Sequence, residues 1–549
     1  MNNTLGCYGN PVVKTPTIDR LASMGVQFNN GYCNYPVSGP SRASFLTGLY
    51  PQTTTILDNR KTLASVLGDR TTLPALFKQN GYQTMSLGKV FHGKSVDNDP
   101  KAWDEEYAFG PTKLGETGER RNIGNGALSW CEWMAANGYR TEYYGKWHAP
   151  YQFASNYRNE VKTTNKDKHA KNVQSNVEAF RKYLTKFYGE ARKPANGELT
   201  DFMSLRPYKA LQIDGRFGQV QNFEPNGKPS KSNGDSQANN IGIFNSEPDA
   251  SLTAFEGHEA LTALKAMKTD ELFSLTCSFG HPHPPFIIPK EYAGRYDKDQ
   301  LSVPLSITDN LVNAPYSQSN QAADARFKNA EMAKQLKWIY YSMVTQVDDW
   351  VGKLLDELDR KGIANNTLVV FVSDHGEMLG DHGLVSKNKM YEGSVHVPML
   401  MRYPKVIPAG KKVEAPVSHH DIFATILDYT RMKTPQNDGR SLRKLIDGKK
   451  DSTDYAVSVW GAINNGGPFM IRKDDWKMIV YLQMNEKKNK NVNALYNLKT
   501  DPLELTNLIG ANPDKAKYEK TTDELKQTFK GWMNKTNTPY IKQLEAAKL

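Results

Sequence analysis

The chain has 549 residues, of which 38% are hydrophobic and 23% are charged, a composition typical of a water-soluble globular protein with several domains. It contains no run of about 18 apolar residues, which excludes a membrane-spanning helix, and its 41 Gly and 29 Pro residues follow no fixed period, which excludes a collagen-like chain. The net charge of +11 favours an acidic partner such as a sulfated glycan, although scattered basic residues serve solubility equally well. We expect no nucleic-acid partner.

The cysteines and the start of the chain leave the cellular compartment open. Cys7, Cys33, Cys131 and Cys277 fit neither a zinc motif nor a disulfide framework. Residues 1–4 have neither the basic nor the apolar region of a signal peptide.

Helices and buried strands alternate along the chain. Residues 17–24 read as a helix that Gly25 ends, and residues 329–360 read as a long amphipathic helix. Residues 272–279 and 367–372 are continuous apolar runs, which favour central parallel strands buried on both faces. This alternation predicts a doubly wound α/β sheet.

One local pattern occurs twice. Residues 80–84 (NGYQT) precede 88–92 (GKVFH), and residues 137–141 (NGYRT) precede 145–148 (GKWH). Each copy reads as a helix, a Gly stop, a short strand and a loop that carries Lys and His.

The character of the chain changes near residue 450. We predict a large α/β domain over 1–450 and a smaller C-terminal α+β subdomain over 451–549, with an insertion over 195–250 that is rich in Asn, Gly, Ser and Lys. In the smaller part we expect antiparallel strands at 455–460 and 476–481 and a helix at 516–534.

Residues 37–48 (VSGPSRASFLTG) carry the strongest chemical signal. Pro40 suits the first position of a helix, which would put Ser38 just before the helix N-terminus, where backbone N–H groups favour an anion. Arg42, one turn on, adds a fixed positive charge. A capped surface helix explains the same residues without any ligand.

These residues resemble the signature of the formylglycine-dependent sulfatase family, Cys or Ser-x-Pro-Ser-Arg followed by Leu-Thr-Gly. Further blocks resemble the family in its order, and they favour members of the iduronate-2-sulfatase-like and choline-sulfatase-like type. These blocks are 5–10, 15–22, 88–92, 282–286, 373–377 and 495–508. The resemblance implies an alkaline-phosphatase-like fold, with a large, mostly parallel mixed sheet flanked by helices.

The resemblance also implies a cofactor and a partner. Ser38 would be oxidised to formylglycine by an anaerobic-type, radical-SAM sulfatase-maturating enzyme. One hydroxyl of the hydrated aldehyde would attack sulfur, and the other would then allow sulfate to leave. Asp374 and His375, just after the strand at 367–372, match the family's metal pair, which implies Ca²⁺ or Mg²⁺. A turn with a helix cap is the simpler explanation of those two residues.

Three further residues match family positions that act on the sulfate group. Lys89 and His92 match residues that hold the sulfate and tune the formylglycine, and Lys387 matches a sulfate-binding lysine, with Lys389 as a rival. A surface loop explains Lys89 and His92 equally well without the family.

A histidine is the expected proton donor to the leaving oxygen. His283 is the first choice, because prolines fix its loop and its ordinary pKa suits the task. His281 competes for this assignment. Lys146, His148 and His396 are weaker candidates for substrate binding, for which a structural role or burial is an equal alternative.

One family feature is missing. The family begins with a strand that ends in two metal-binding aspartates, and residues 1–4 hold neither the strand nor the carboxylates. Either the chain as given starts downstream of the true start, which we favour because every later block is intact, or it is a degenerate relative. A missing strand would expose the ladder groups of its neighbours.

The sequence therefore predicts a Ser-type sulfatase that acts on a sulfated carbohydrate, periplasmic or secreted in a bacterium. One alternative is a phosphodiesterase or phosphonate monoester hydrolase of the same superfamily. The other is a non-catalytic glycan-binding relative that has lost the metal aspartates.

Overall fold

The computed structural model describes eleven stretches of the chain. They are residues 1–68, 70–92, 98–108, 241–244, 248–284, 286–315, 330–451, 453–461, 466–482, 492–547 and 549. The second copy of the repeated pattern, with Lys146 and His148, lies outside them, as does most of the predicted insertion. No helix in these stretches is long and apolar enough to cross a membrane.

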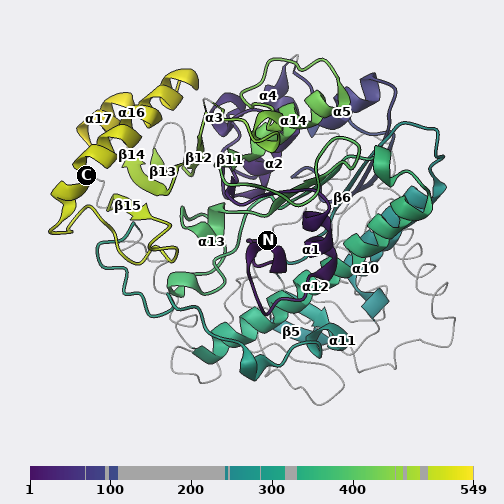
Figure 1. The fold of residues 1–549 in the computed structure, drawn as a ribbon, viewed down its shortest axis with the longest axis horizontal. Coiled ribbons are helices and arrows are strands. Elements are labelled where there is room, and N and C mark those ends of the chain that lie inside the picture. The colour runs from purple at the N-terminus through teal and green to yellow at the C-terminus, as the bar shows by residue number, and fades with distance from the viewer. Residues whose placement is uncertain are drawn as a thin grey trace, which may run out of the picture. The chain divides into compact units, whose positions relative to one another are not determined.

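Helices and strands alternate, which confirms the α/β class (Figure 1). The helices are α1 (Pro16–Ser23), α2 (Ser38–Thr47), α3 (Pro51–Thr54), α4 (Ala64–Leu67), α5 (Leu73–Gln79), α10 (Leu252–Ala266), α11 (Lys290–Ala293), α12 (Ala330–Arg360), α13 (Glu392–Val395), α14 (His419–Thr430), α15 (Arg443–Ile446), α16 (Glu519–Lys535) and α17 (Ile541–Ala546). The strands are β1 (Val26–Phe28), β2 (Gly31–Tyr32), β3 (Gln83–Gly88), β4 (Glu105–Ala108), β5 (Ile241–Phe244), β6 (Phe273–Ser278), β7 (Phe286–Pro289), β8 (Val369–Val372), β9 (Met399–Arg402), β10 (Lys411–Val413), β11 (Val417–Ser418), β12 (Tyr455–Val459), β13 (Gly467–Lys473), β14 (Trp476–Leu482) and β15 (Ala494–Asn497).

These elements belong to two compact units. The first unit is made of residues 1–73, 302–333 and 362–549, and the second of residues 74–301 and 334–361. The predicted helices at 17–24, 329–360 and 516–534 are present as α1, α12 and α16.

The first unit contains a four-stranded mixed sheet in the order β10-β1-β9-β8. β1 is parallel to β10 and antiparallel to β9, and β8 is antiparallel to β9. α1 begins with Pro16. Proline has no backbone N–H, and an N–H in the first turn of a helix has no partner within the helix, so no hydrogen bond is lost there. α14 begins with a capping box between Ser418 and Asp421.

The prediction of central parallel strands is wrong for β8 and incomplete for β6. Among the described residues β8 pairs only with antiparallel β9, and β6 pairs only with parallel β3, so both are edge strands. All residues of both strands are partly exposed. An apolar, β-branched run reports strand propensity, but it does not fix how many neighbours the strand has.

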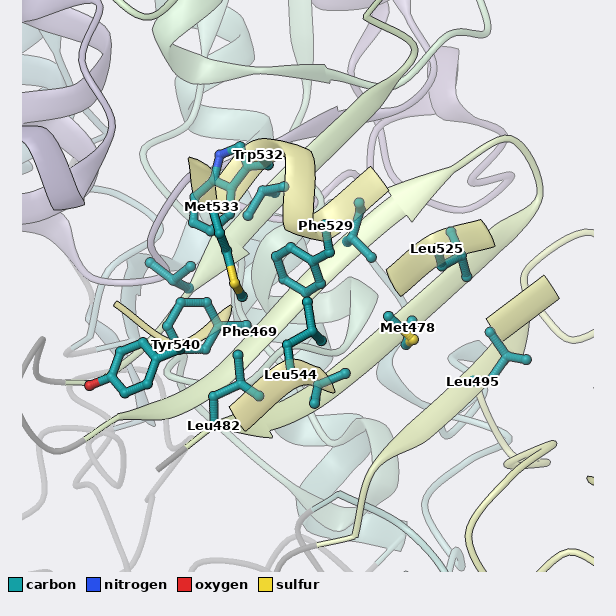
Figure 2. Packing of buried hydrophobic residues seen from close by; sticks show 14 of the residues in the cluster. Phe469, Met478, Leu482, Leu495, Leu525, Phe529, Trp532, Met533, Tyr540 and Leu544 are labelled. Atoms are coloured by element: carbon teal, nitrogen blue, oxygen red, sulfur yellow. The ribbon is translucent and has the colours of Figure 1, made fainter. Parts of the chain in front are cut away.

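A second sheet of the first unit, β12-β13-β14-β15, is antiparallel throughout, as predicted for the C-terminal part. Helices α16 and α17 cover one of its faces (Figure 2). Leu525, Phe529, Trp532 and Met533 recur at helical spacing along α16, and all four are buried. The ring of Phe529 lies edge-on to that of Phe469 on β13, with centroids 6.3 Å apart.

A buried ionic contact joins this sheet to α13. Lys477 on β14 is fully buried, and its ammonium lies 2.8 Å from a carboxylate oxygen of Glu392 and 2.8 Å from one of Glu504. These partners satisfy a charge that would be costly to bury alone.

In the second unit, β3 pairs in parallel with both β4 and β6, and β5 pairs in parallel with β7. α10 and α12 pack closely at Gly257. The Trp350 ring lies so near that a Cβ added to Gly257 would be 2.3 Å from it. α5, the left-handed Gly81 and β3 form the predicted helix, Gly stop and strand of the first repeat copy.

Truncation of Phe529 tests the C-terminal core. Phe529→Ala should lower the free energy of unfolding by about 3–5 kcal/mol, since it opens a cavity in fully buried packing. Denaturant titration would measure the change. Gln527→Ala, at an exposed position two residues earlier on α16, is the control and should change stability by less than ~0.5 kcal/mol. Equal effects would contradict the described packing.

Candidate active site

The start of α2 positions Ser38 and Arg42, the two signature residues expected to take part in the chemistry. The helix begins at Ser38 itself, two positions before the predicted start at Pro40, because the Ser41 amide already donates to the Val37 carbonyl at 3.0 Å. Pro40 therefore lies inside the first turn, where its missing N–H breaks no helical bond. The Gly39 amide donates to Oδ1 of Asn59 at 2.8 Å.

Ser38 is 4% exposed, and its Oγ lies 3.2 Å from Nε2 of His375. Nδ1 of His375 lies 2.9 Å from the Gly376 carbonyl oxygen, which can only accept, so Nδ1 carries the proton. Burial is the largest cause that lowers the pKa of His375 to about 3. The ring is therefore neutral at ordinary pH, and its Nε2 accepts the hydrogen of the Ser38 hydroxyl.

Asp374 is held by α2 from two sides. The Arg42 side chain donates to Oδ2 of Asp374 from Nε at 3.0 Å and from Nη2 at 2.9 Å. The Ser41 hydroxyl donates to the Asp374 carbonyl oxygen, and Oδ1 of Asp374 accepts the His375 amide at 3.0 Å. The end of β8 and the start of α2 thus form one polar cluster.

His419 and Ser41 extend this cluster, although the sequence analysis did not select either of them. Nδ1 of His419, at the first position of α14, lies 2.9 Å from the Ser41 hydroxyl oxygen. The Ser41 hydroxyl donates its hydrogen to the Asp374 carbonyl, so Nδ1 of His419 is the donor in its contact with Ser41. The Ser418–Asp421 capping box marked a helix start here and is the signal that could have found His419.

The two rival lysines both lie within electrostatic reach of Glu377. The charge of Lys387 lowers the pKa of His375 and opposes the rise at Glu377, and the charge of Glu377 acts on Lys389 as well. Lys389 is buried, and its Nζ donates to the Lys387 carbonyl at 3.1 Å. Burial lowers the pKa of Lys389 to about 8.

Residues 1–3 lie against the same end of β8. The main-chain nitrogen of Met1 is 2.8 Å from the His375 carbonyl oxygen, and Nδ2 of Asn2 donates to the Glu377 carbonyl at 2.9 Å. Asn3 lies 3.3 Å from Nδ1 of His396.

His396 is buried, and both of its ring nitrogens have partners. Nδ1 is 2.9 Å from a carboxylate oxygen of Glu392, and Nε2 is 2.8 Å from the Asn29 carbonyl oxygen. These contacts favour the structural alternative for His396 over substrate binding.

In the second unit, the carboxyl ends of β3 and β6 bring the other candidates together. Gly88 is the last residue of β3 and pairs with Ser278, the last of β6. The Ser278 hydroxyl donates to the Lys89 carbonyl at 2.7 Å. His92 follows and is partly buried, like Lys89.

His283 and His281 differ in exposure. His283 is exposed, and Nδ1 lies 2.6 Å from the Pro284 carbonyl oxygen, so Nδ1 is the donor in this contact. His281 is less exposed, and burial lowers its pKa to about 4. The exposed ring suits proton transfer to a substrate.

The described residues do not fit a Ca²⁺ site. That ion takes about six to eight oxygen ligands, whereas both carboxylate oxygens of Asp374 accept protein N–H groups and Nε2 of His375 accepts from Ser38. Within the described stretches no group of three or more His, Cys, Asp or Glu residues could hold a metal ion.

The comparisons with known proteins cover nearly the whole chain. The sulfatase family matches residues 1–115 and 107–432, and the C-terminal part of N-sulphoglucosamine sulphohydrolase matches residues 380–535. N-acetylglucosamine-6-O-sulfatase of Bacteroides thetaiotaomicron is 26% identical over 95% of this chain and 82% of its own. Human iduronate 2-sulfatase is 25% identical over 81% of this chain and 64% of its own.

Solved structures share the fold. A protein in complex with its substrate D-glucosamine-2-N,6-O-disulfate superposes with a TM-score of 0.62 at 19% identity, over 98% of this chain and 96% of that one. The phosphonate monoester hydrolase of Agrobacterium radiobacter superposes with a TM-score of 0.64 at 19% identity, over 96% and 93%.

The chain has the α/β fold that these solved structures share, and a buried serine, an arginine and an aspartate meet at the end of its strand β8. The match of the family over most of its length shows that the chain belongs to the sulfatase family, and it is a sulfuric ester hydrolase.

Loss of Arg42 tests the ion pair. Arg42→Met should lower the free energy of unfolding by about 3 kcal/mol, because it leaves the mostly buried Asp374 carboxylate without its cation. The double variant with Asp374→Asn should lose less than the sum of the single losses. Denaturant titration measures all three.

A matched control uses an exposed pair at a similar distance. Lys268 lies 2.8 Å from Glu271 on the surface, and Lys268→Met should leave the free energy of unfolding nearly unchanged, because water screens an exposed ion pair. Equal losses for Arg42→Met and Lys268→Met would show that burial does not strengthen the Arg42 contact.

Proposed function

We propose that this protein hydrolyses sulfate esters of a carbohydrate through formylglycine made from Ser38. The observation that carries the proposal is the Ser38 hydroxyl, buried in the first turn of α2 and directed at the neutral Nε2 of His375. The class of substrate is supported by the sulfated amino sugars named for two of the similar proteins.

The surroundings of Ser38 suit an aldehyde hydrate, which, when present, supplies the hydroxyl that attacks sulfur and a second hydroxyl that releases sulfate. Nε2 of His375 accepts a hydroxyl proton at position 38. The first turn of α2 and the Arg42 side chain place positive potential at this serine.

Other side chains act on the sulfate and on the leaving group. Lys89, His92 and Lys387 bind sulfate oxygens, where negative charge develops as the ester bond breaks. His283, through the nitrogen that does not bond to Pro284, donates a proton to the leaving oxygen.

The partner that this chemistry needs is an anaerobic-type sulfatase-maturating enzyme. The bacterial relatives support a bacterial source and a periplasmic or secreted location. Ca²⁺ is implied by the family resemblance alone, the described residues do not fit it, and none of the roles above depends on it.

Ser38 can be tested by mass and by turnover. Co-expression with the maturating enzyme should lighten the Ser38 peptide by two hydrogen atoms, and the product should release sulfate from glucosamine 6-sulfate. Ser38→Ala, expressed in the same way, should show neither change. A matured wild-type protein that releases phosphonate products but no sulfate would overturn the proposal in favour of a phosphonate monoester hydrolase.

His283→Ala should lower turnover of a sugar sulfate by ~10²-fold, as expected for a lost general acid. The loss should be much smaller for a nitrophenyl sulfate, because that leaving group needs little protonation. Parallel rate measurements on both esters give the comparison, with His281→Gln as the control for the rival residue. Equal losses on the two esters would remove His283 from proton transfer.

A further inference from the structure

Glu256 is a buried carboxyl group that the mechanism above does not use. It lies in α10 and is 3% exposed. The backbone amide of Gly280 donates to both of its oxygens, at 2.9 Å to Oε2 and 3.2 Å to Oε1. One neutral donor therefore serves a group that could accept about four hydrogen bonds.

Gly280 begins the turn that carries His283. It directly follows the end of β6, and its carbonyl accepts the His283 amide at 3.0 Å. The hydrogen bond from the Gly280 amide to Glu256 thus fixes the first residue of this turn. The hydrogen bond from the His283 amide to the Gly280 carbonyl then closes the turn.

The end of β3 lies on the same carboxyl group. Gly88 has a φ of +77°, and a Cβ added there would lie 2.0 Å from the Ser278 carbonyl oxygen and 3.6 Å from Oε1 of Glu256. Lys89 comes next and is tied to Ser278 by the hydroxyl bond described above. Glu256 therefore lies beneath both segments that carry proposed sulfate-handling residues.

Among the described residues no charge balances an ionised Glu256, and no ion pair reaches it. Cys277 lies near it on β6. Burial is the main cause that raises the pKa of the Cys277 thiol, and the charge of Glu256 is the second cause. His281 in the adjacent turn has a pKa of about 4 and is neutral, and on α12 the apolar ring of Trp350 packs against the neighbouring Gly257. Burial raises the pKa of Glu256 to about 8, against a small opposing effect of the Gly280 amide.

We propose that Glu256 is a positioning residue that acts as a neutral carboxylic acid and holds the turn of His283 and the end of β3 in register. The proposal rests on the proposed function, because its effect on turnover passes through Lys89 and His283. Its effect on stability does not.

The experiment compares the matured full-length protein with Glu256→Gln and Glu256→Leu. Gln keeps an acceptor for the Gly280 amide at nearly the same shape but cannot ionise, whereas Leu removes the acceptor. Melting temperature and the turnover of a sugar sulfate are each measured from pH 5 to pH 9.5.

The pH dependence has a defined sign. The folded protein keeps the Glu256 proton up to about pH 8, whereas an unfolded chain releases it near pH ~4.3. As the pH rises from about 4.3 to about 8, the melting temperature of wild type should therefore fall relative to that of Glu256→Gln. Above about pH 8 the difference between the two melting temperatures should stay constant. Wild-type turnover should fall ~10-fold relative to Glu256→Gln by pH 9.5.

Glu256→Leu should lose about 10-fold in kcat at every pH with a smaller change in KM, because substrate still binds while the His283 turn is misplaced. Glu259→Gln, on the same helix at a less buried carboxyl group, is the control and should show no pH-dependent difference.

A melting-temperature difference between wild type and Glu256→Gln that stays constant with pH would overturn the neutral carboxyl. A Glu256→Leu variant with wild-type kcat would overturn the positioning role. If no variant and no wild-type sample releases sulfate, the proposed function fails, and the melting curves still decide the state of Glu256.

Discussion

The contact between the first turn of α2 and the end of β8 is the constraint on which the candidate site depends. Arg42 and Ser41 hold Asp374 from two directions, and Ser38 hydrogen-bonds to the next residue, His375. Each of these groups is mostly buried, so each needs the others to satisfy its hydrogen bonds. A helix start and a strand end that are remote in sequence therefore become one polar unit.

The buried polar groups in the two units are balanced differently. In the first unit Arg42 pairs with Asp374, and Lys477 contacts both Glu392 and Glu504. In the second unit, among the described residues, Glu256 accepts only from a backbone amide. Buried charges that are paired keep their protonation state over a wide pH range, whereas the protonation of an unpaired buried acid changes with pH.

Much of this could be predicted from the sequence, because short motifs fix local geometry. The helix that Gly25 ends, the Gly stop before β3 and the helix at 516–534 were predicted correctly, and the signature at Ser38 identified the family. The role of His419 could not be predicted, since it depends on a contact with Ser41 across 378 residues of chain. Lys387 and Lys389 stay rivals for sulfate binding, because the charge of Glu377 acts with both of them. The edge position of β8 was missed because strand pairing is not local.

The distance along the chain between the two halves of the polar unit also has a kinetic side. Ser38 and His375 are separated by 337 residues, and a ribosome adds roughly 5–20 residues per second. After Ser38 leaves the ribosome, its docking partner is therefore absent for about 20–70 s. The maturating enzyme of the proposed function would have that interval of synthesis in which to reach Ser38, before burial closes access to it.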